Sequence, residues 1–196
     1  MKELVLASKS PRRKELMDTF GHPFTICPAE EEEIIDQSLA PSELVMALAK
    51  QKAEEVIQKH PHAVVVGADT VVVLQGVIFG KPKTEEQAFS MLEALQGNWH
   101  TVYTGLCIME EGQESHHSFC ATKVEMMPLS DRDIKAYIAQ GESMDKAGAY
   151  GIQGKGAWLM KGIEGDYFNV VGLPLCTLGQ ELKKFGIYLL GSEGAS

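Results

Sequence analysis

The sequence predicts an α/β fold in which short apolar strands alternate with amphipathic helices. The chain has 196 residues, 44% hydrophobic and 23% charged, which suits one globular domain with a sizeable core. The clearest strand is the valine-rich run at residues 63–74, and the clearest helix spans residues 41–59, where apolar residues recur at helical spacing. We expect a single domain over residues 1–190, with residues 191–196 as a disordered tail or an expression remnant.

The first strand and helix are expected at the N-terminus. Residues 4–7 predict a buried strand, and a helix should begin at Pro11, after an N-cap serine, and run to about residue 20. Its first turn holds Arg12, Arg13 and Lys14, at the end of the helix that is already positive. Two interpretations stay open: a bound phosphate offsets this charge, or the turn is solvated. We expect Arg13→Ala to leave the ligand-free protein as stable or slightly more stable.

An acidic run follows a second expected strand at residues 24–27. Glu30 to Glu33 are four consecutive glutamates, and such a run is usually solvated surface. One member is also a candidate metal ligand, because magnesium is commonly held by one or two carboxylates together with substrate phosphates. In the helix at 41–59, Lys52 falls on the apolar stripe. Either Lys52 points inward to a functional partner, or its stem packs while the ammonium reaches solvent.

Asp69 lies in the middle of the longest apolar run of the chain. An unpaired carboxylate there would cost several kcal/mol, so Asp69 needs a metal, a cation or a strand end open to water. The alternative is an ordinary turn after a strand that ends at Gly67. A turn at residues 75–76 should fold residues 71–79 into a hairpin, which returns Lys81 near the segment of Asp69.

The second half of the chain continues the alternation of helices and strands. The expected elements are a helix from the capping box at Thr84 to Gly97, strands at 99–109 and 119–127, a short helix after Ser130 and a helix near Pro174. His116 and His117, between the two strands, are more often an incidental surface pair than a metal site. Residues 148–156 hold four glycines, a freedom that is costly unless a ligand approaches closely. This segment is not a P-loop, because no Ser or Thr follows its lysines.

Composition excludes several classes of protein. The net charge of -9 and a pI near 5.2 argue against broad binding to a nucleic acid polymer, which needs a basic face. The four cysteines form no C-x-x-C pair, which is typical of the reducing cytosol, and we expect them to be buried thiols. No apolar segment is long enough to span a membrane. A cytoplasmic protein without a membrane partner is therefore expected.

The charged candidates together form the inventory for a metal-bound polyphosphate. Arg12 and Arg13 share the first helix, and Lys52 and Lys81 come from two other segments. Asp69 and the glutamate run supply the carboxylates. Phosphoryl chemistry needs positioning and charge neutralisation more than a covalent nucleophile. A carboxylate that orients or deprotonates water, with magnesium bridging phosphates, would suffice. No serine-hydrolase elbow, zinc signature, dinucleotide fingerprint or D-x-D motif competes.

Four segments, in family order, resemble the Maf-family nucleotide pyrophosphatases. They are ASKSPRRKEL at 7–16, GADT at 67–70, GKP at 80–82 and MDKAGAYGIQG at 144–154, and the resemblance covers residues 2 to about 189. It implies a mixed α/β fold with an elongated bent sheet, flanking helices and two lobes around a cleft, similar to the inosine triphosphate pyrophosphatases. It also implies that a nucleoside triphosphate is hydrolysed to the monophosphate and pyrophosphate with a divalent cation, Mg²⁺ or Mn²⁺.

The resemblance implies roles for individual residues. Asp69 matches the general base, and Asp69 and Glu33 are the implied metal ligands, although the acidic run permits Glu32 in place of Glu33. The implied substrate-choice positions are Arg12, Thr70 and Gln153, and the implied phosphate contacts are Ser8, Arg13, Lys52 and Lys81. Thr70 and Gln153 resemble the subfamily acting on dTTP and UTP, with modified pyrimidine nucleotides as further candidates, rather than the one acting on 7-methylated GTP.

Two other functions stay open. One is a nucleotide-binding regulator of septum formation in cell division without essential catalysis, and the other is a phosphatase that removes terminal phosphates. Asp69 favours an enzyme over a sensor, because a sensor has no use for a carboxylate that orients water. The products separate a pyrophosphatase from a phosphatase. The expected partner is a small nucleoside triphosphate, and a homodimer is typical of similar proteins.

Overall fold

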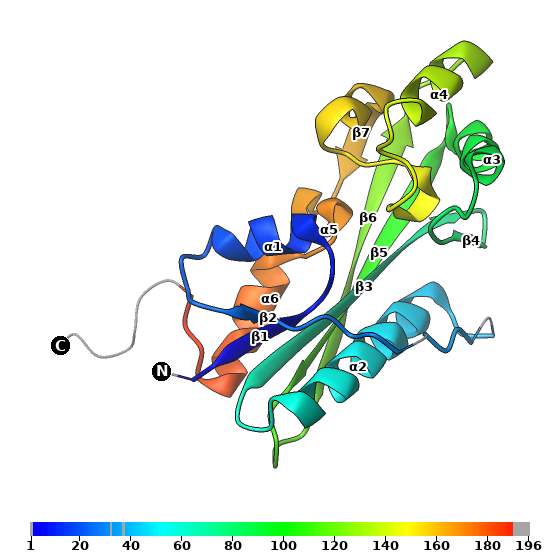
Figure 1. Cartoon of the computed structure of the whole chain (residues 1–196). Coiled ribbons are helices and arrows are strands. Elements are labelled where there is room, and N and C mark those ends of the chain that lie inside the picture. The colour runs from blue at the N-terminus through cyan, green and yellow to red at the C-terminus, as the bar shows by residue number, and fades with distance from the viewer. Residues whose placement is uncertain (1, 32, 37, 190–196) are drawn as a thin grey trace. The chain divides into compact units, whose positions relative to one another are not determined.

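A computed structural model describes residues 2–31, 33–36 and 38–189 (Figure 1). The strands are β1 (Leu4–Ala7), β2 (Thr25–Ile26), β3 (Val64–Leu74), β4 (Val77–Phe79), β5 (Trp99–Met109), β6 (His116–Met126) and β7 (Met160–Glu164). The helices are α1 (Pro11–Asp18), α2 (Pro41–Lys59), α3 (Glu85–Leu95), α4 (Asp131–Ile138), α5 (Tyr167–Val171) and α6 (Leu175–Leu182), with 3₁₀ turns η1 (Ala147–Ala149), η2 (Gly154–Leu159) and η3 (Lys183–Phe185). The predicted tail at 191–196 lies outside the described residues.

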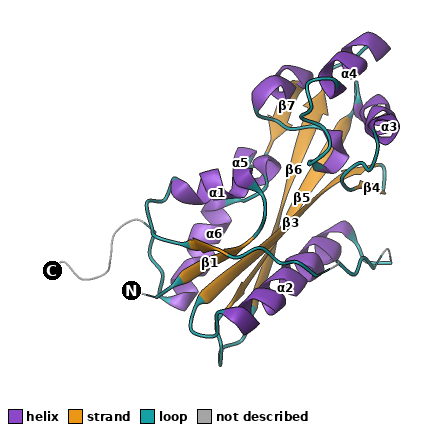
Figure 2. Cartoon of the chain, in the orientation of Figure 1, coloured by secondary structure: helices purple, strands orange, loops and turns teal. Residues whose placement is uncertain are grey.

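The strands of the described residues form one seven-stranded mixed sheet. Its order is β2-β1-β3-β5-β6-β7, and β4 pairs with β3. β1 runs parallel to both β2 and β3, whereas β4 is antiparallel to β3 and β7 is antiparallel to β6. Figure 2 shows the helices that flank the strands. The predicted mixed α/β fold is therefore confirmed.

The chain divides into two compact units. Unit 1 comprises Met1–Asp69, Thr104–Cys120 and Gly172–Ser196, and unit 2 comprises Thr70–Tyr103 and Ala121–Val171. Strands β3, β5 and β6 contribute residues to both units.

Helix α2 packs on the sheet of unit 1 at unusually short range. The apolar cluster between them comprises Val5, Ala7, Ala49, Ala53, Val56, Ala63, Val65, Cys107 and Met109. A Cβ at Gly67 of β3 would lie 2.1 Å from the carbonyl oxygen of Ala49, and one at Gly105 of β5 would lie 2.3 Å from that of Val45. Only glycine fits at such an approach of helix backbone to strand backbone. These two glycines therefore let α2 lie close to β3 and β5.

Unit 2 has its own core under α3, α4 and η1. Its buried residues are Val72, Ala88, Met91, Leu92, Leu95, Val102, Val124, Met126, Ile134, Tyr137, Ile138, Ala149, Tyr150 and Leu159. The predicted caps form here: Thr84 Oγ1 accepts from the backbone N–H of Gln87, and Ser130 Oγ accepts from that of Asp133. The 3.6-residue pattern of α3 and α4 thus places their apolar faces on the strands of this unit.

Three sequence expectations need correction. β6 begins at His116, so His116 and His117 are strand residues rather than members of a connecting loop. Only Cys107 is a fully buried thiol, and Cys176 is exposed. The first helix ends at Asp18, two residues before the predicted end. Among the helices described, none is both long and apolar enough to span a bilayer.

Candidate functional site

Asp69 is a strand residue with a cation as its partner. β3 continues through residues 67–69, so the alternative of a turn after Gly67 is wrong. The side chain of Asp69 is 14% exposed and that of Lys52 is 15% exposed, and Lys52 Nζ donates a hydrogen bond to Asp69 Oδ1. Lys52 thus points inward, as the functional interpretation predicts. A cation, one of the partners expected for Asp69, is therefore present beside it.

The fold brings Lys52 to Asp69 through the close approach of α2 to β3. Gly67, two residues before Asp69, faces the backbone of Ala49. Lys52 follows Ala49 by three residues, so both lie on the same side of the helix. The close approach of α2 to β3 therefore brings the side chain of Lys52 to Asp69. The position of Lys52 depends on Gly67 having no side chain.

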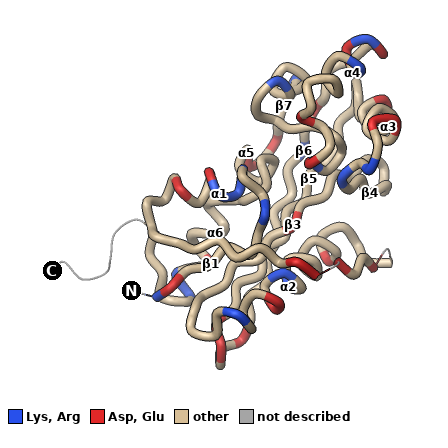
Figure 3. Tube along the Cα trace, viewed as in Figure 1, with Lys and Arg blue, Asp and Glu red and all other residues tan. Residues whose placement is uncertain are grey.

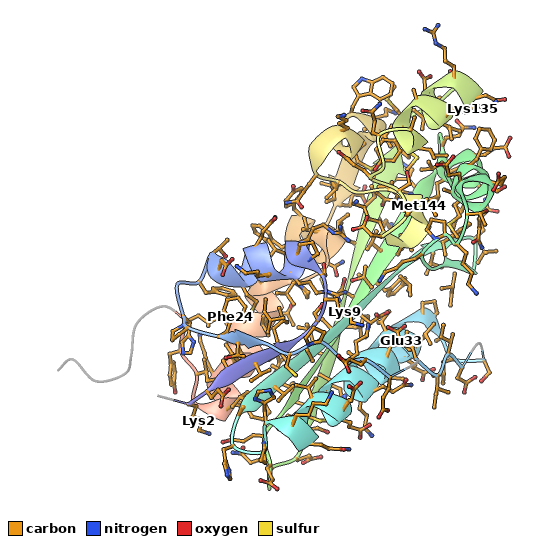
Figure 4. The ribbon with its side chains drawn as sticks, viewed as in Figure 1. Lys2, Lys9, Phe24, Glu33, Lys135 and Met144 are labelled. Atoms are coloured by element: carbon orange, nitrogen blue, oxygen red, sulfur yellow. The ribbon has the colours of Figure 1, made fainter. Side chains whose placement is uncertain are left out.

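Glu33 forms a salt bridge with the same ammonium group, that of Lys52. Its Oε1 lies 2.9 Å from Lys52 Nζ, and its side chain is 40% exposed. Figure 4 labels Glu33, which lies beside α2. Lys52 therefore pairs with two carboxylates from different elements, one well covered and one more open. Glu32, the alternative carboxylate, lies outside the described residues.

Arg13 is buried rather than solvated. Its Nε donates to the carbonyl oxygen of Gly172 at 2.7 Å, and its Nη1 donates to the carbonyl oxygen of Ala68 at 3.0 Å and to Ser8 Oγ at 3.3 Å. Burial lowers the pKa of Arg13, while the carboxylate of Asp69 opposes this shift. The solvated-turn interpretation is wrong for Arg13. The stability of Arg13→Ala stays a prediction, but these contacts reverse its expected direction, because two carbonyl groups would lose a donor.

Ser8 and Arg12 complete the basic start of α1. Ser8 is buried, and its Oγ accepts hydrogen bonds from the backbone N–H of Ser10 at 3.2 Å and from Arg13. Arg12 is partly buried, and its positive charge contributes to lowering the pKa of Arg13. Ser10 caps the helix by accepting from the backbone N–H of Arg13. Two guanidinium groups and a helix N-terminus thus gather in unit 1, an arrangement suited to an anion.

The donor set in unit 1 fits a hard divalent cation shared with phosphates. Glu33 and Asp69 both converge on Lys52, and magnesium is usually bound by one or two carboxylates together with substrate oxygens. No group of three or more His, Cys, Asp or Glu side chains suited to a metal occurs in the part of the chain that the structure describes. Figure 3 shows both acidic and basic residues on α2.

The three other predicted residues belong to unit 2. Thr70 follows Asp69 on β3 and is partly buried, Lys81 is exposed after β4, and Gln153 is partly buried just before η2. The backbone N–H of Gly148 donates to the carbonyl oxygen of Gly80 at 3.0 Å. This bond joins the glycine-rich segment that carries Gln153 to the segment that carries Lys81.

Packing explains part of the glycine content of residues 148–156, for which close approach of a ligand was expected. Gly148 has a φ of 68°, and a Cβ there would lie 3.0 Å from Val72. A Cβ at Gly156 would lie 2.0 Å from the carbonyl oxygen of Gly151. Ala149 also has a positive φ, of 62°, which is strained for a residue with a side chain. The segment is thus held in a tight conformation by its own contacts.

Neutral hydrogen bonds fix this glycine-rich segment in unit 2. Tyr137 Oη accepts from the backbone N–H of Gly151 at 3.1 Å, and a 2.5 Å hydrogen bond joins His100 Nε2 to Tyr150 Oη. Burial lowers the pKa of His100 to about 4 and raises the pKa of Tyr150. Sequence reasoning missed these partners. Tyr150 lies inside the glycine-rich motif, but nothing in the sequence pointed to a residue 50 positions earlier.

Comparison with known proteins gives consistent matches. Residues 3–185 match the family model described as Maf-like protein. The chain is 50% identical over 185 residues to a dTTP/UTP pyrophosphatase of Carboxydothermus hydrogenoformans, covering 94% of this chain and 99% of that protein. It is 50% identical over 186 residues to a dTTP/UTP pyrophosphatase of a Geobacillus species, covering 95% and 100%.

A solved structure supports the fold. A HAM1 protein from Coxiella burnetii matches with a TM-score of 0.57 and 16% identity, covering 94% of this chain and 100% of that chain. At this identity the likeness concerns the fold alone.

Proposed function

The chain belongs to the Maf family, and we propose that it hydrolyses dTTP and UTP to the nucleoside monophosphate and pyrophosphate. The observation that carries the proposal is the group of Asp69, Lys52 and Glu33, whose carboxylates act electrostatically on Arg13. It is supported by relatives of 50% identity that are named dTTP/UTP pyrophosphatases. These names favour an enzyme over a regulator without catalysis.

In the proposed reaction Asp69 is the general base. Its Oδ1 accepts from Lys52, which fixes the orientation of the carboxylate, and we assign the water to Oδ2. Asp69 takes a proton from this water while the water oxygen bonds to a phosphorus of the α–β bridge. The bond from that phosphorus to the bridging oxygen breaks, and its electrons leave with the departing group.

Glu33 and Asp69 are the residues that would hold a divalent cation, Mg²⁺ or Mn²⁺. Such an ion would neutralise phosphate charge and polarise the reacting phosphoryl group. The proposal assigns the rest of the phosphate charge to Ser8, Arg13, Lys52 and Lys81. A guanidinium that is already fixed by backbone carbonyls, as Arg13 is, would contact a phosphate without losing further conformational entropy.

Substrate choice is assigned to Arg12, Thr70 and Gln153. An amide offers both a donor and an acceptor, so Gln153 can match the edge of a thymine or uracil base. Modified pyrimidine nucleotides stay candidates, because the same base edge is present when substituents lie elsewhere on the ring. The cytoplasmic location and the homodimer also stay predictions.

Product analysis tests this proposal. Purified protein with magnesium or manganese should convert dTTP and UTP to the monophosphate and pyrophosphate, and it should act less on ATP, GTP and 7-methylated GTP. Orthophosphate and a diphosphate as first products would instead identify a phosphatase. Nucleotide binding with no turnover at all would favour the regulator.

A further inference from the structure

Helix α2 also binds the backbone of the acidic segment that carries Glu33. The backbone N–H of Glu30 donates to both carboxylate oxygens of Glu55, at 3.0 and 2.9 Å, and that of Glu31 donates to Glu55 Oε2 at 3.0 Å. Glu55 is 9% exposed although its side chain is charged. A carboxylate buried to this degree is retained when several donors satisfy it, and here two of them are backbone groups just before Glu33.

Gln51 binds the same segment just after Glu33. The backbone N–H of Ile34 donates to Gln51 Oε1 at 2.9 Å, and Gln51 Nε2 donates to the carbonyl oxygen of Ile34 at 2.9 Å. The side-chain amide thus satisfies both polar groups of one residue, as a neighbouring strand would. Glu55 and Gln51 therefore bind the chain on the two sides of Glu33.

Glu55 stays ionised over the whole physiological range. Lys59 Nζ donates to Glu55 Oε1 at 2.9 Å, and this bond, with those from Glu30 and Glu31, lowers the pKa of Glu55 to about 2. Its capacity to accept the two backbone bonds is therefore constant near neutral pH.

The spacing on α2 explains why one helix can serve all these contacts. Gln51 and Glu55 are four residues apart and share one face of the helix, and Lys52, next to Gln51, reaches both Glu33 and Asp69. We propose that Gln51 and Glu55 are positioning residues, which hold the backbone around Glu33 so that its carboxylate stays at Lys52 and Asp69. This inference rests on the proposed function, in which Glu33 acts on the metal-bound phosphates.

A double-mutant cycle tests whether Glu55 acts through Glu33. Glu55→Gln keeps the volume but removes the charge and one acceptor oxygen. We expect kcat/KM for dTTP to fall about tenfold, as for other residues that orient a metal ligand, and the Mg²⁺ concentration for half-maximal rate to rise. Glu33→Gln should lose more, and adding Glu55→Gln to it should cost no further activity. Independent, multiplying losses would overturn the proposal.

Two neighbours on the same helix give matched controls. Glu54→Gln makes the same chemical change one position away, where the carboxylate pairs with exposed Lys50 at 3.5 Å. Gln58→Ala matches Gln51→Ala at an exposed position. Both controls should stay within about twofold of the wild type, since exposed pairs contribute little, whereas Gln51→Ala should repeat the Glu55→Gln effect. A loss of the same size in the controls would also overturn the proposal.

Hydrogen exchange gives a measure that needs no activity. In Glu55→Gln the amides of Glu30 and Glu31 should exchange at least about tenfold faster, because their acceptor loses its charge and one oxygen. In Gln51→Ala the amide of Ile34 should exchange faster to a similar degree, because its acceptor is removed. Exchange should be unchanged in Glu54→Gln. Unchanged exchange in both Glu55→Gln and Gln51→Ala would overturn the proposal that these side chains hold the backbone around Glu33. If the wild type released no pyrophosphate, the proposed function would fail, but the exchange measurement would still show whether Gln51 and Glu55 hold the backbone around Glu33.

Discussion

Units 1 and 2 hold their predicted site residues by different physical means. In unit 1, Lys52 joins the carboxylates of Asp69 and Glu33, so opposite charges fix the group. In unit 2, the segment of Gln153 is fixed mainly by backbone geometry and by neutral hydroxyl and imidazole groups, at Tyr137 and His100. One carboxylate contributes as well, because Glu142 accepts from the backbone N–H of Lys155 at 3.4 Å. Removing one charged group from a partly buried ion pair leaves the other charge without compensation, which destabilises the protein. Neutral packing instead depends on shape and on which groups stay unprotonated.

The difference suits the proposed chemistry. Phosphates and a divalent cation bring several charges, which unit 1 can exchange for its own ion pairs. The edge of a nucleotide base brings neutral donors and acceptors. A rigid backbone can discriminate between bases, because a base that does not match leaves polar groups unpaired. Changes of charge should therefore damage unit 1 most, and changes of shape or protonation should damage unit 2.

The largest expected effect is on catalysis in Asp69→Asn. The substitution keeps the volume and a hydrogen-bond acceptor for Lys52, but it removes the base and a metal-binding oxygen. We expect the rate of pyrophosphate release from dTTP to fall at least about a hundredfold. Thermal unfolding checks that the variant is folded. Turnover near that of the wild type would show that Asp69 is not the base and that the charges of unit 1 serve only stability.

The next effect concerns the close approach that brings Lys52 to Asp69. Gly67→Ala would place a Cβ 2.1 Å from the carbonyl oxygen of Ala49, so the helix must shift. We expect the free energy of unfolding to fall by about 3 kcal/mol, the upper end of overpacking effects, and activity to fall with it.

Gly179→Ala is the matched control for Gly67→Ala within unit 1. Gly179 lies in α6, and among the residues that the structure describes its added Cβ would meet Leu189 alone, at 3.6 Å, which is an ordinary contact. A helical glycine replaced by alanine should stabilise by up to about 1 kcal/mol. Urea denaturation measures the free energy of unfolding of both variants. Equal changes in the two variants would contradict the role assigned to Gly67.

Arg13→Ala should have a somewhat smaller effect on stability. It leaves the carbonyl groups of Ala68 and Gly172 without this donor, and we expect a loss of about 2 kcal/mol in the free energy of unfolding. Lys14→Ala, in the same turn, removes an exposed pair with Asp18 and should change stability by less than about 0.5 kcal/mol. Unchanged stability of Arg13→Ala would restore the interpretation in which this charge only opposes the helix dipole.

Local patterns in the sequence predicted most of the fold. Helix α2 has the predicted bounds, because a proline at its first position and a long apolar stripe both mark it. The β3–β4 hairpin also forms as predicted from its two-residue turn. The start of β6 at His116 was missed, since its first three residues, His116, His117 and Ser118, are all polar and carry no apolar signal.

The candidate site was predictable where a residue breaks a local rule. Asp69 in a valine run and Lys52 on an apolar stripe each demand a partner, and the structure pairs them. The roles of Glu55 and Gln51 were not predictable, because charged and amide side chains on a helix are ordinary by sequence. Their partners are backbone groups of a segment over 15 residues away, and such contacts leave no pattern in the sequence.

The smallest expected effect is the pH dependence of stability that arises from the protonation of His100 in unit 2. His100 is 3% exposed, and its pKa is lowered from 6.5 to about 4. The unfolded chain therefore binds a proton that the folded protein does not bind between these two values. Stability from this group is fully present above pH 6.5 and is lost as the pH falls toward 4.

Between pH 7 and pH 5, the free energy of unfolding should fall by about 1–2 kcal/mol more in the wild type than in His100→Gln. Urea denaturation of both proteins at the two pH values measures this difference, and carboxylates that titrate in both proteins cancel in the comparison. The His100→Gln protein is itself expected to be less stable at pH 7, because it loses the bond to Tyr150. Parallel pH curves would mean that His100 binds its proton in the folded protein, and the neutral hydrogen bond that fixes Tyr150 would then be a charged one.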